Sequence, residues 1–189
     1  MREHKPTIRF AAGVAALAAL ALASCDAPAA PGDVTAETKK VAGPGASQQE
    51  LVKALRQAVA RFHSLAQATR AGYDGTGEPC VAAPGLGAMG VHFANRDLID
   101  PAFDPLQPEV LLYEPQKNGQ FKLLGVEFVV INVGQPAPTF GGQPFDVGGV
   151  PPLEALGIPH WTLHVWVWRG NPSGLFAPFN RAVSCAAAE

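Results

Sequence analysis

The sequence lacks the short motifs that mark common hydrolase and nucleotide-binding sites. It contains no G-x-S-x-G, no H-E-x-x-H, and no glycine loop that leads from a strand into a helix and could hold phosphate. It also has no internal repeat. Because these motifs are absent, any enzyme hypothesis has to rest on the placement of individual side chains.

Long hydrophobic runs are also missing. The apolar run at residues 10–22 is shorter than the about 20 residues that a membrane-spanning helix needs. It follows a basic start and precedes Leu22-Ala23-Ser24-Cys25, an arrangement typical of a secretory signal. The motif resembles the lipobox of bacterial lipoproteins. That resemblance implies cleavage before Cys25 and diacylation of its thiol.

We therefore expect a signal peptide at residues 1–24, a lipidated tether at 25–46 and a single domain at 47–189. Acyl chains contribute about 0.8 kcal/mol per buried methylene, so two or more would anchor the domain to a membrane. The expected location is the extracytoplasmic side of a bacterial membrane, inner or outer, within the cell envelope. A secreted protein with an unmodified Cys25 is the alternative.

The stretches GAMGVHFAN and HWTLHVWVWRGNPSGLF are similar to bacterial envelope proteins of no assigned function. This resemblance implies no particular chemistry.

Positive charge is scarce in the expected mature chain. Removal of residues 1–24 takes away three of the 14 basic and one of the 16 acidic residues, which leaves an excess of four acidic residues. No basic patch remains to neutralise phosphates, so nucleic acid is not an expected partner. The expected partners are the membrane, through the lipid anchor, and a small ligand or an envelope protein.

Only two cysteines remain after Cys25. Outside the cytoplasm thiols oxidise, so we expect a disulfide between Cys80 and Cys185. The chain-entropy estimate for a loop of about 100 residues is about 4 to 5 kcal/mol as an upper figure. Two thiolate ligands for a soft metal are the alternative.

The apolar periodicity predicts one long helix followed by strands. Ser47 and Glu50 form a capping-box pattern, and apolar side chains then recur at helical spacing as far as Gly72, which gives a helix of about 24 residues. Strands are expected at residues 90–94, 110–114, 121–133 and 160–169, with a hairpin at Asn118-Gly119.

The segment at residues 134–159 is rich in proline and glycine and is expected to be an irregular loop that gates a binding site. The order of elements predicts a single α+β domain, with one long N-terminal helix packed on a curved antiparallel sheet of four or more strands.

Residues 160–169 alternate between two kinds of side chain. If the apolar set that includes Trp161 and Leu163 faces the helix, the other set points to the second face of the sheet. Glu127, the one charge in an apolar strand, and His92 can share that face. The candidate metal or ligand residues are His92, Glu127, His160 and His164, and the candidate pocket aromatics are Trp166 and Trp168.

Imidazole and carboxylate ligands suit zinc, iron or copper, so the expected cofactor is one of these transition metals. His160 and His164 are about 13 Å apart along an ideal strand, so both can bind one ion only if the strand bends. The alternative is structural: histidines bonded to the backbone, and a cross-strand ion pair between Glu127 and His164.

Three functions follow from these patterns. The first is a lipid-anchored envelope binding protein whose His/Glu/Trp pocket takes a metal or small ligand. The second is a metal-dependent enzyme that uses the same residues, with Glu127 as ligand or general base. The third is an interaction module that docks a protein or glycan on an exposed aromatic face.

Overall fold

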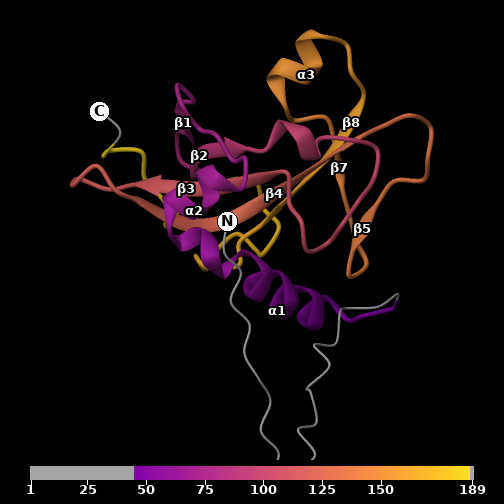
Figure 1. Ribbon diagram of the computed structural model, residues 1–189, viewed down its shortest axis with the longest axis horizontal. Helices are drawn as coiled ribbons and strands as arrows, with labels where there is room; N and C mark the ends of the chain where they lie inside the picture. Colours follow the sequence, from indigo (N-terminus) through magenta and orange to yellow (C-terminus); the bar gives the residue numbers. More distant parts are fainter. Residues whose placement is uncertain (1–44, 188–189) are drawn as a thin grey trace, which may run out of the picture. The chain divides into compact units, whose positions relative to one another are not determined.

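The computed structural model describes residues 45–187 and has a curled antiparallel sheet as its centre (Figure 1). Six strands pair in the order β1-β2-β3-β4-β8-β7. Their bounds are β1 Cys80–Ala83, β2 Gly87–Ala94, β3 Val110–Pro115, β4 Phe121–Ile131, β7 Asp146–Val147 and β8 His160–Val165. Together with several short helices, this sheet confirms a mixed α+β fold.

The single long helix predicted at residues 47–72 is wrong. The chain instead forms α1 (Gln48–Val59), a 3-10 turn η1 (Ala60–His63) and α2 (Leu65–Arg70). The capping box of Ser47 and Glu50 does start α1. The break comes at Ser64, whose backbone is extended (φ −88°, ψ 108°).

A tertiary contact explains this break. The hydroxyl of Tyr113, on β3, donates a 2.6 Å hydrogen bond to the carbonyl of Phe62, and both residues are buried. That carbonyl therefore accepts a hydrogen bond from the sheet. In a continuous α-helix it would accept one from the backbone amide four residues later. The amphipathic pattern of the sequence contains no sign of this bond.

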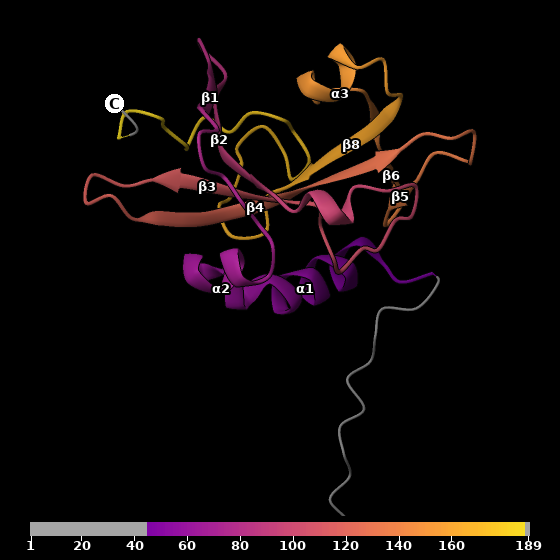
Figure 2. The ribbon, with the colours of Figure 1, turned by 45° about the horizontal axis from the view of Figure 1, so that its top comes forward.

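The sheet separates two apolar cores, with α1 and α2 on one side and α3 (Pro151–Ala155) on the other (Figure 2). The larger core joins the helices to one face of the strands and includes Leu55, Val59, Phe128 and Leu163. The smaller core, on the other face, comprises Ala88, Val110, Leu112, Leu124, Val129, Trp166 and Val183. Both faces of the sheet are thus covered, and the second layer is the thinner one.

An irregularity in the β3–β4 ladder changes which side chains share a face. The register shifts between Leu112 and Tyr113, so that Leu112 pairs with Gly125 and Tyr113 pairs with Leu123. Strict alternation predicts Leu124 on the face of Val126 and Phe128; instead Leu123 joins the larger core and Leu124 the smaller one. A bulge of this kind inserts one residue and reverses the alternation beyond it.

The hairpin predicted at Asn118-Gly119 is confirmed. Gln116 and Gln120 close the turn between β3 and β4 through a 2.8 Å backbone hydrogen bond, and Gly119 has a positive φ of 75°.

The irregular loop predicted at residues 134–159 contains regular structure. It includes β5 (Thr139–Phe140), β6 (Gln143–Pro144), β7 and α3, and β7 pairs with β8. Val150 and Leu153 pack against the smaller core, whereas Phe140 and Phe145 belong to the larger core. The segment therefore contributes to both faces of the sheet. The one remaining helical element within residues 45–187 is η2 (Arg96–Leu98).

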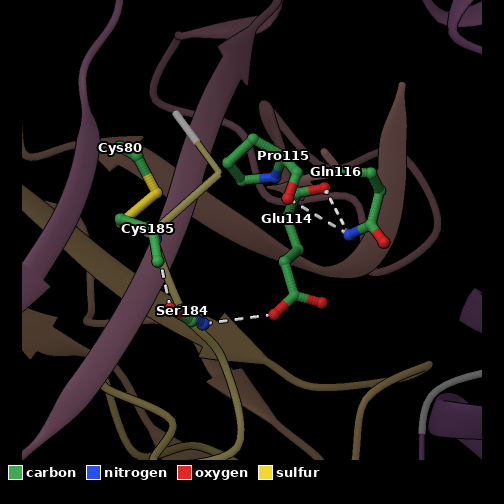
Figure 3. The surroundings of a disulfide bond; sticks show 7 residues. Cys80, Glu114, Pro115, Gln116, Ser184 and Cys185 are labelled. Atoms are coloured by element: carbon green, nitrogen blue, oxygen red, sulfur yellow. Dashed lines mark hydrogen bonds between the residues drawn. A yellow bond between two sulfur atoms is a disulfide. The ribbon is translucent and has the colours of Figure 1, made fainter. Parts of the chain in front are cut away.

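The predicted disulfide is present. Cys80, on β1, is bonded to Cys185 near the C-terminal end, with a sequence separation of 105 and a Cα–Cα distance of 5.6 Å (Figure 3). The amide of the neighbouring Ser184 donates to Oε1 of Glu114, on β3. The thiols are therefore paired and are not metal ligands, and the C-terminal segment is fixed to the sheet.

Cys25, the predicted signal peptide and nearly all of the predicted tether lie outside the described residues. Within residues 45–187, none of the helices has both the length and the apolar character to cross a bilayer.

Candidate metal centre

Three strands bring His92, Glu127 and His164 to the same face of the sheet. Glu127 on β4 is directly opposite His164 on β8. Across β3, Glu127 pairs with Val110 and His92 pairs with Leu112. Residues that pair across an antiparallel ladder point to the same side, and positions two apart on one strand do so too. The three side chains therefore converge on the face opposite α1 and α2.

The geometry of this cluster is close to that of a metal site. One ligand atom from each residue can be chosen so that all three lie within 4.8 Å of one another. His92 Nε2 is 3.6 Å from Glu127 Oε2, and the two imidazole centroids are 6.1 Å apart. Ligand atoms around a tetrahedral ion at ~2.1 Å stand about 3.4 Å apart. Small side-chain rotations would therefore bring all three groups onto one ion.

The cluster is buried on all sides except at His92. Glu127 is 4% exposed and His164 7% exposed, whereas the His92 side chain retains 21% of its accessible surface. An ion or a small molecule would therefore approach from the His92 side.

Burial makes the neutral forms of all three side chains the favoured ones. Desolvation raises the pKa of Glu127 to about 8, and the nearby Glu109 carboxylate adds to this rise. Desolvation lowers the pKa of His92 to about 4 and that of His164 to about 3. At neutral pH the contact between His92 and Glu127 is therefore not an ion pair, despite its 3.6 Å distance.

One atom of the cluster has an unmet bonding requirement. His164 Nε2 is buried, and it has no hydrogen-bond partner among the described residues. A buried polar atom without a partner costs about 1–3 kcal/mol. A cation bound between the three side chains would use this nitrogen as a ligand and would also stabilise the charged form of Glu127.

Trp166, one of the two candidate pocket aromatics, lies beside the cluster. Its ring is stacked with that of His164 at a centroid distance of 6.5 Å, and its Nε1–H donates to the carbonyl of Ala177. Trp166 is only 3% exposed. It therefore packs against His164 and does not form an exposed aromatic surface.

Trp168 does not lie where the alternation predicts. β8 ends at Val165, and the amides of Trp168 and Arg169 both donate to the carbonyl of Leu124. Two residues after β8 are therefore bonded to one residue of β4, as in a β-bulge, and the alternation of side chains between the two faces reverses there. As a result Trp168 packs with the larger core, on the side of the helices. The expected aromatic face of Trp166 and Trp168 is therefore not formed.

His160 is not part of the cluster. Its Nδ1 is 2.8 Å from the carbonyl of Ile158, and its Nε2 accepts a 3.1 Å hydrogen bond from the amide of Val150. Both ring nitrogens are thus engaged by the backbone, and the structural interpretation holds for this residue. The strand does not bend to bring His160 to the site of His164.

Glu109 is a buried acidic residue that the sequence patterns do not single out. It lies just before β3, is 2% exposed, and accepts a 2.9 Å hydrogen bond from the amide of Val129 through Oε2. Burial raises its pKa to about 8. The sequence around Glu109 gives only a weak signal of burial. Pro108 precedes it and a strand follows it, and a charged residue in a turn at that point is equally compatible with exposure to solvent.

The chain was compared with protein-family models, with curated proteins and with solved structures, and none of these comparisons gave a match.

Proposed function

We propose that this protein is a lipid-anchored binding protein of the bacterial cell envelope that holds one transition-metal ion through His92, Glu127 and His164. The observation that carries the proposal is the convergence of three ligand atoms within 4.8 Å around a buried His164 Nε2 that has no partner among residues 45–187. Two imidazoles and one carboxylate suit zinc, copper or iron.

The surroundings of the site favour metal binding over a purely structural role. Glu127 is surrounded by an apolar layer, and a lone buried carboxyl is costly there unless it is protonated or paired with a cation. A structural cross-strand ion pair would need a charged histidine. The lowered pKa values of His92 and His164 disfavour that charge, whereas a metal ion binds the neutral imidazoles directly.

A metal-dependent enzyme is the second candidate, because three protein ligands leave a coordination position for water, as in catalytic zinc sites. The access route is narrow, since only His92 is partly exposed. That favours a bound ion over a site that must also admit a substrate. Exchange of a metal-bound water with solvent, measured by water-proton relaxation on a paramagnetic ion, would favour the enzyme.

The lipid anchor is proposed on the residues Leu22-Ala23-Ser24-Cys25. Mass spectrometry of the protein isolated from bacterial membranes tests it directly. A mature chain that begins with an acylated Cys25 supports the anchor, and a chain that retains residues 1–24 or carries an unmodified Cys25 contradicts it.

Metal content is the first measurement to make. Residues 26–189 are produced in an oxidising compartment without a histidine tag, and bound metals are measured by elemental analysis after exposure to zinc, copper or iron and dialysis. We expect near-stoichiometric metal in the parent and loss of it in His164→Ala.

His63→Ala is the matched control, because His63 is an exposed histidine on η1, outside the cluster. It is expected to retain metal. A folded parent that retains no metal, or equal loss in both variants, contradicts the proposal.

A further inference from the structure

An open groove runs along α1, on the side of the sheet opposite the metal centre. Its volume is about 550 Å³, within the range of about 300–1,000 Å³ that is usual for small-molecule sites. The residues that line it extend along α1 from Gln48 to the following Ala60. At 1.5 Å per residue this is a length of about 18 Å.

The floor of the groove is apolar. It is formed by Val52 and Ala60 from the helical segment and by Trp168 and Leu175 from the chain after β8. The Trp168 ring contacts the ring of His63 at a centroid distance of 4.4 Å. The Nε1–H of Trp168 is buried and has no hydrogen-bond acceptor within residues 45–187. Contacts of the ring therefore position this side chain, without a hydrogen bond.

The rim of the groove is cationic. Lys53 and Arg56 line it, both are exposed, and none of the aspartates or glutamates of residues 45–187 lines it. The ion pairs found within residues 45–187 involve neither of these two cations. They are three positions apart on α1, where like charges repel each other. Arg56 stacks on Trp168, with Cζ 4.7 Å from the ring centroid, which leaves the edge of the guanidinium free to donate hydrogen bonds.

The charge of the helical layer supports an anionic ligand. Residues 48–70 contain four basic side chains and the acidic Glu50, although the chain as a whole has a net charge of −2. The basic side chains are Lys53, Arg56, Arg61 and Arg70. An anion is therefore attracted to this layer, and only Lys53 and Arg56 stand at the groove.

We propose that this groove binds a fatty acid, with its carboxylate held by Lys53 and Arg56 and its hydrocarbon chain covered by Val52, Trp168 and Leu175. An extended chain of about a dozen carbons has a length of roughly 14 Å, because each ~1.5 Å bond advances the zigzag by only about 1.25 Å, and this length fits the groove. The combination of two cations and an apolar floor distinguishes this ligand from a small inorganic anion, which would not use the floor, and from a neutral lipid, which would not use the cations. The proposal does not depend on the metal centre.

The test uses residues 26–189, so that neither the apolar run at residues 10–22 nor an acyl group on Cys25 competes. Dodecanoate, below its micellar concentration, is titrated by isothermal calorimetry. We expect one molecule bound per chain and at least about tenfold weaker binding in Lys53→Gln/Arg56→Gln, the size of effect that loss of charge-assisted hydrogen bonds gives.

The matched control is Arg61→Gln/Arg70→Gln, which removes the same charge from the helical layer outside the groove. It is expected to bind dodecanoate within about twofold of the parent, since distant exposed charges are screened. Trp168→Leu, which removes no hydrogen bond, is expected to weaken dodecanoate but not acetate.

Three results would overturn the proposal. The first is no saturable binding of dodecanoate, or equal affinity for dodecanol. The second is equal weakening in the two double variants, which would indicate general attraction to the basic layer. The third is binding only to phosphatidylglycerol vesicles and not to monomeric dodecanoate, which would identify a membrane-contact surface.

Discussion

Glu127 and His164 lie directly opposite each other on β4 and β8, and this cross-strand pair places two polar side chains on the second face of the sheet. His92 joins them from β2, on the far side of β3. The result is a polar cluster inside an otherwise apolar layer. Near neutral pH, burial favours the neutral form of each group. The metal ion proposed above would stabilise the charged form of Glu127.

Metal binding should stabilise the folded protein. A ligand at 100 times its dissociation constant adds about 2.7 kcal/mol to the free energy of unfolding. We therefore expect zinc to raise the melting temperature of the parent but not of Glu127→Gln, as measured by circular dichroism. The metal-free variant should melt close to the metal-free parent, because a neutral amide replaces a protonated carboxyl. An equal zinc shift in both proteins would contradict the assignment of Glu127 as a ligand.

The metal-free protein should be most stable between about pH 4.5 and 6.5. The carboxyl groups of Glu109 and Glu127 have a pKa of 4.5 in the unfolded chain, and burial raises it to about 8 in the folded protein. Above pH 6.5 the folded protein therefore retains protons that the unfolded chain has released, and the free energy of unfolding falls as the pH rises to 8.

His92 and His164 act in the opposite direction. Their folded pKa values of about 4 and 3 lie below the 6.5 of a solvated histidine, so the unfolded chain binds the protons. This lowers stability as the pH falls, and below about pH 4.5 the two glutamates no longer offset it. Urea unfolding at pH 4, 5.5, 6.5 and 8 measures the loss of stability on the acidic and on the basic side of the maximum. Glu127→Gln should lose less stability than the parent between pH 6.5 and 8, and a parent whose stability rises over that interval would disprove the assignment.

Removal of the disulfide should destabilise the domain by about 2–4 kcal/mol, because it closes a loop of more than 100 residues. We expect Cys185→Ser to show this loss in urea unfolding, and the parent to show the same loss after reduction. Ser184→Ala is the control, since its side chain only accepts a bond from Ala186. Equal stability of the reduced and oxidised parent would show that the disulfide contributes nothing to the stability of the domain.

Gly90 is expected to be required for the position of His92. Its φ is +95°, and a Cβ at this position would collide with the carbonyl oxygen of Tyr113 on the neighbouring strand. Gly90→Ala should therefore displace β2, cost more than about 2 kcal/mol and weaken zinc binding. Gly119→Ala is the comparison, because φ is also positive there but the space is open; it should cost about 1 kcal/mol and leave zinc binding unchanged.

The candidate site could be predicted in part because its signals are local. Glu127 is the one charge in the apolar part of β4, and His92 and His164 also lie on expected strands. Two changes of alternation were not predictable, the bulge at Leu124 and the reversal at Trp168, because each depends on backbone bonds to a neighbouring strand. The same limit applies to His160, whose ring is bonded to the backbone of the preceding segment.

The sequence alone determined the α+β class, the hairpin at Asn118-Gly119, the cysteine pairing and the start of α1 at its capping box. These features depend on periodicity, on turn residues or on the small number of cysteines. Only the tertiary structure decided that the first helix breaks at Ser64, which of the four candidate ligands meet, and that Trp168 lies over α1. Each of these outcomes depends on a contact between residues distant in sequence, such as the bond from Tyr113 to Phe62, and a one-dimensional pattern does not contain such contacts.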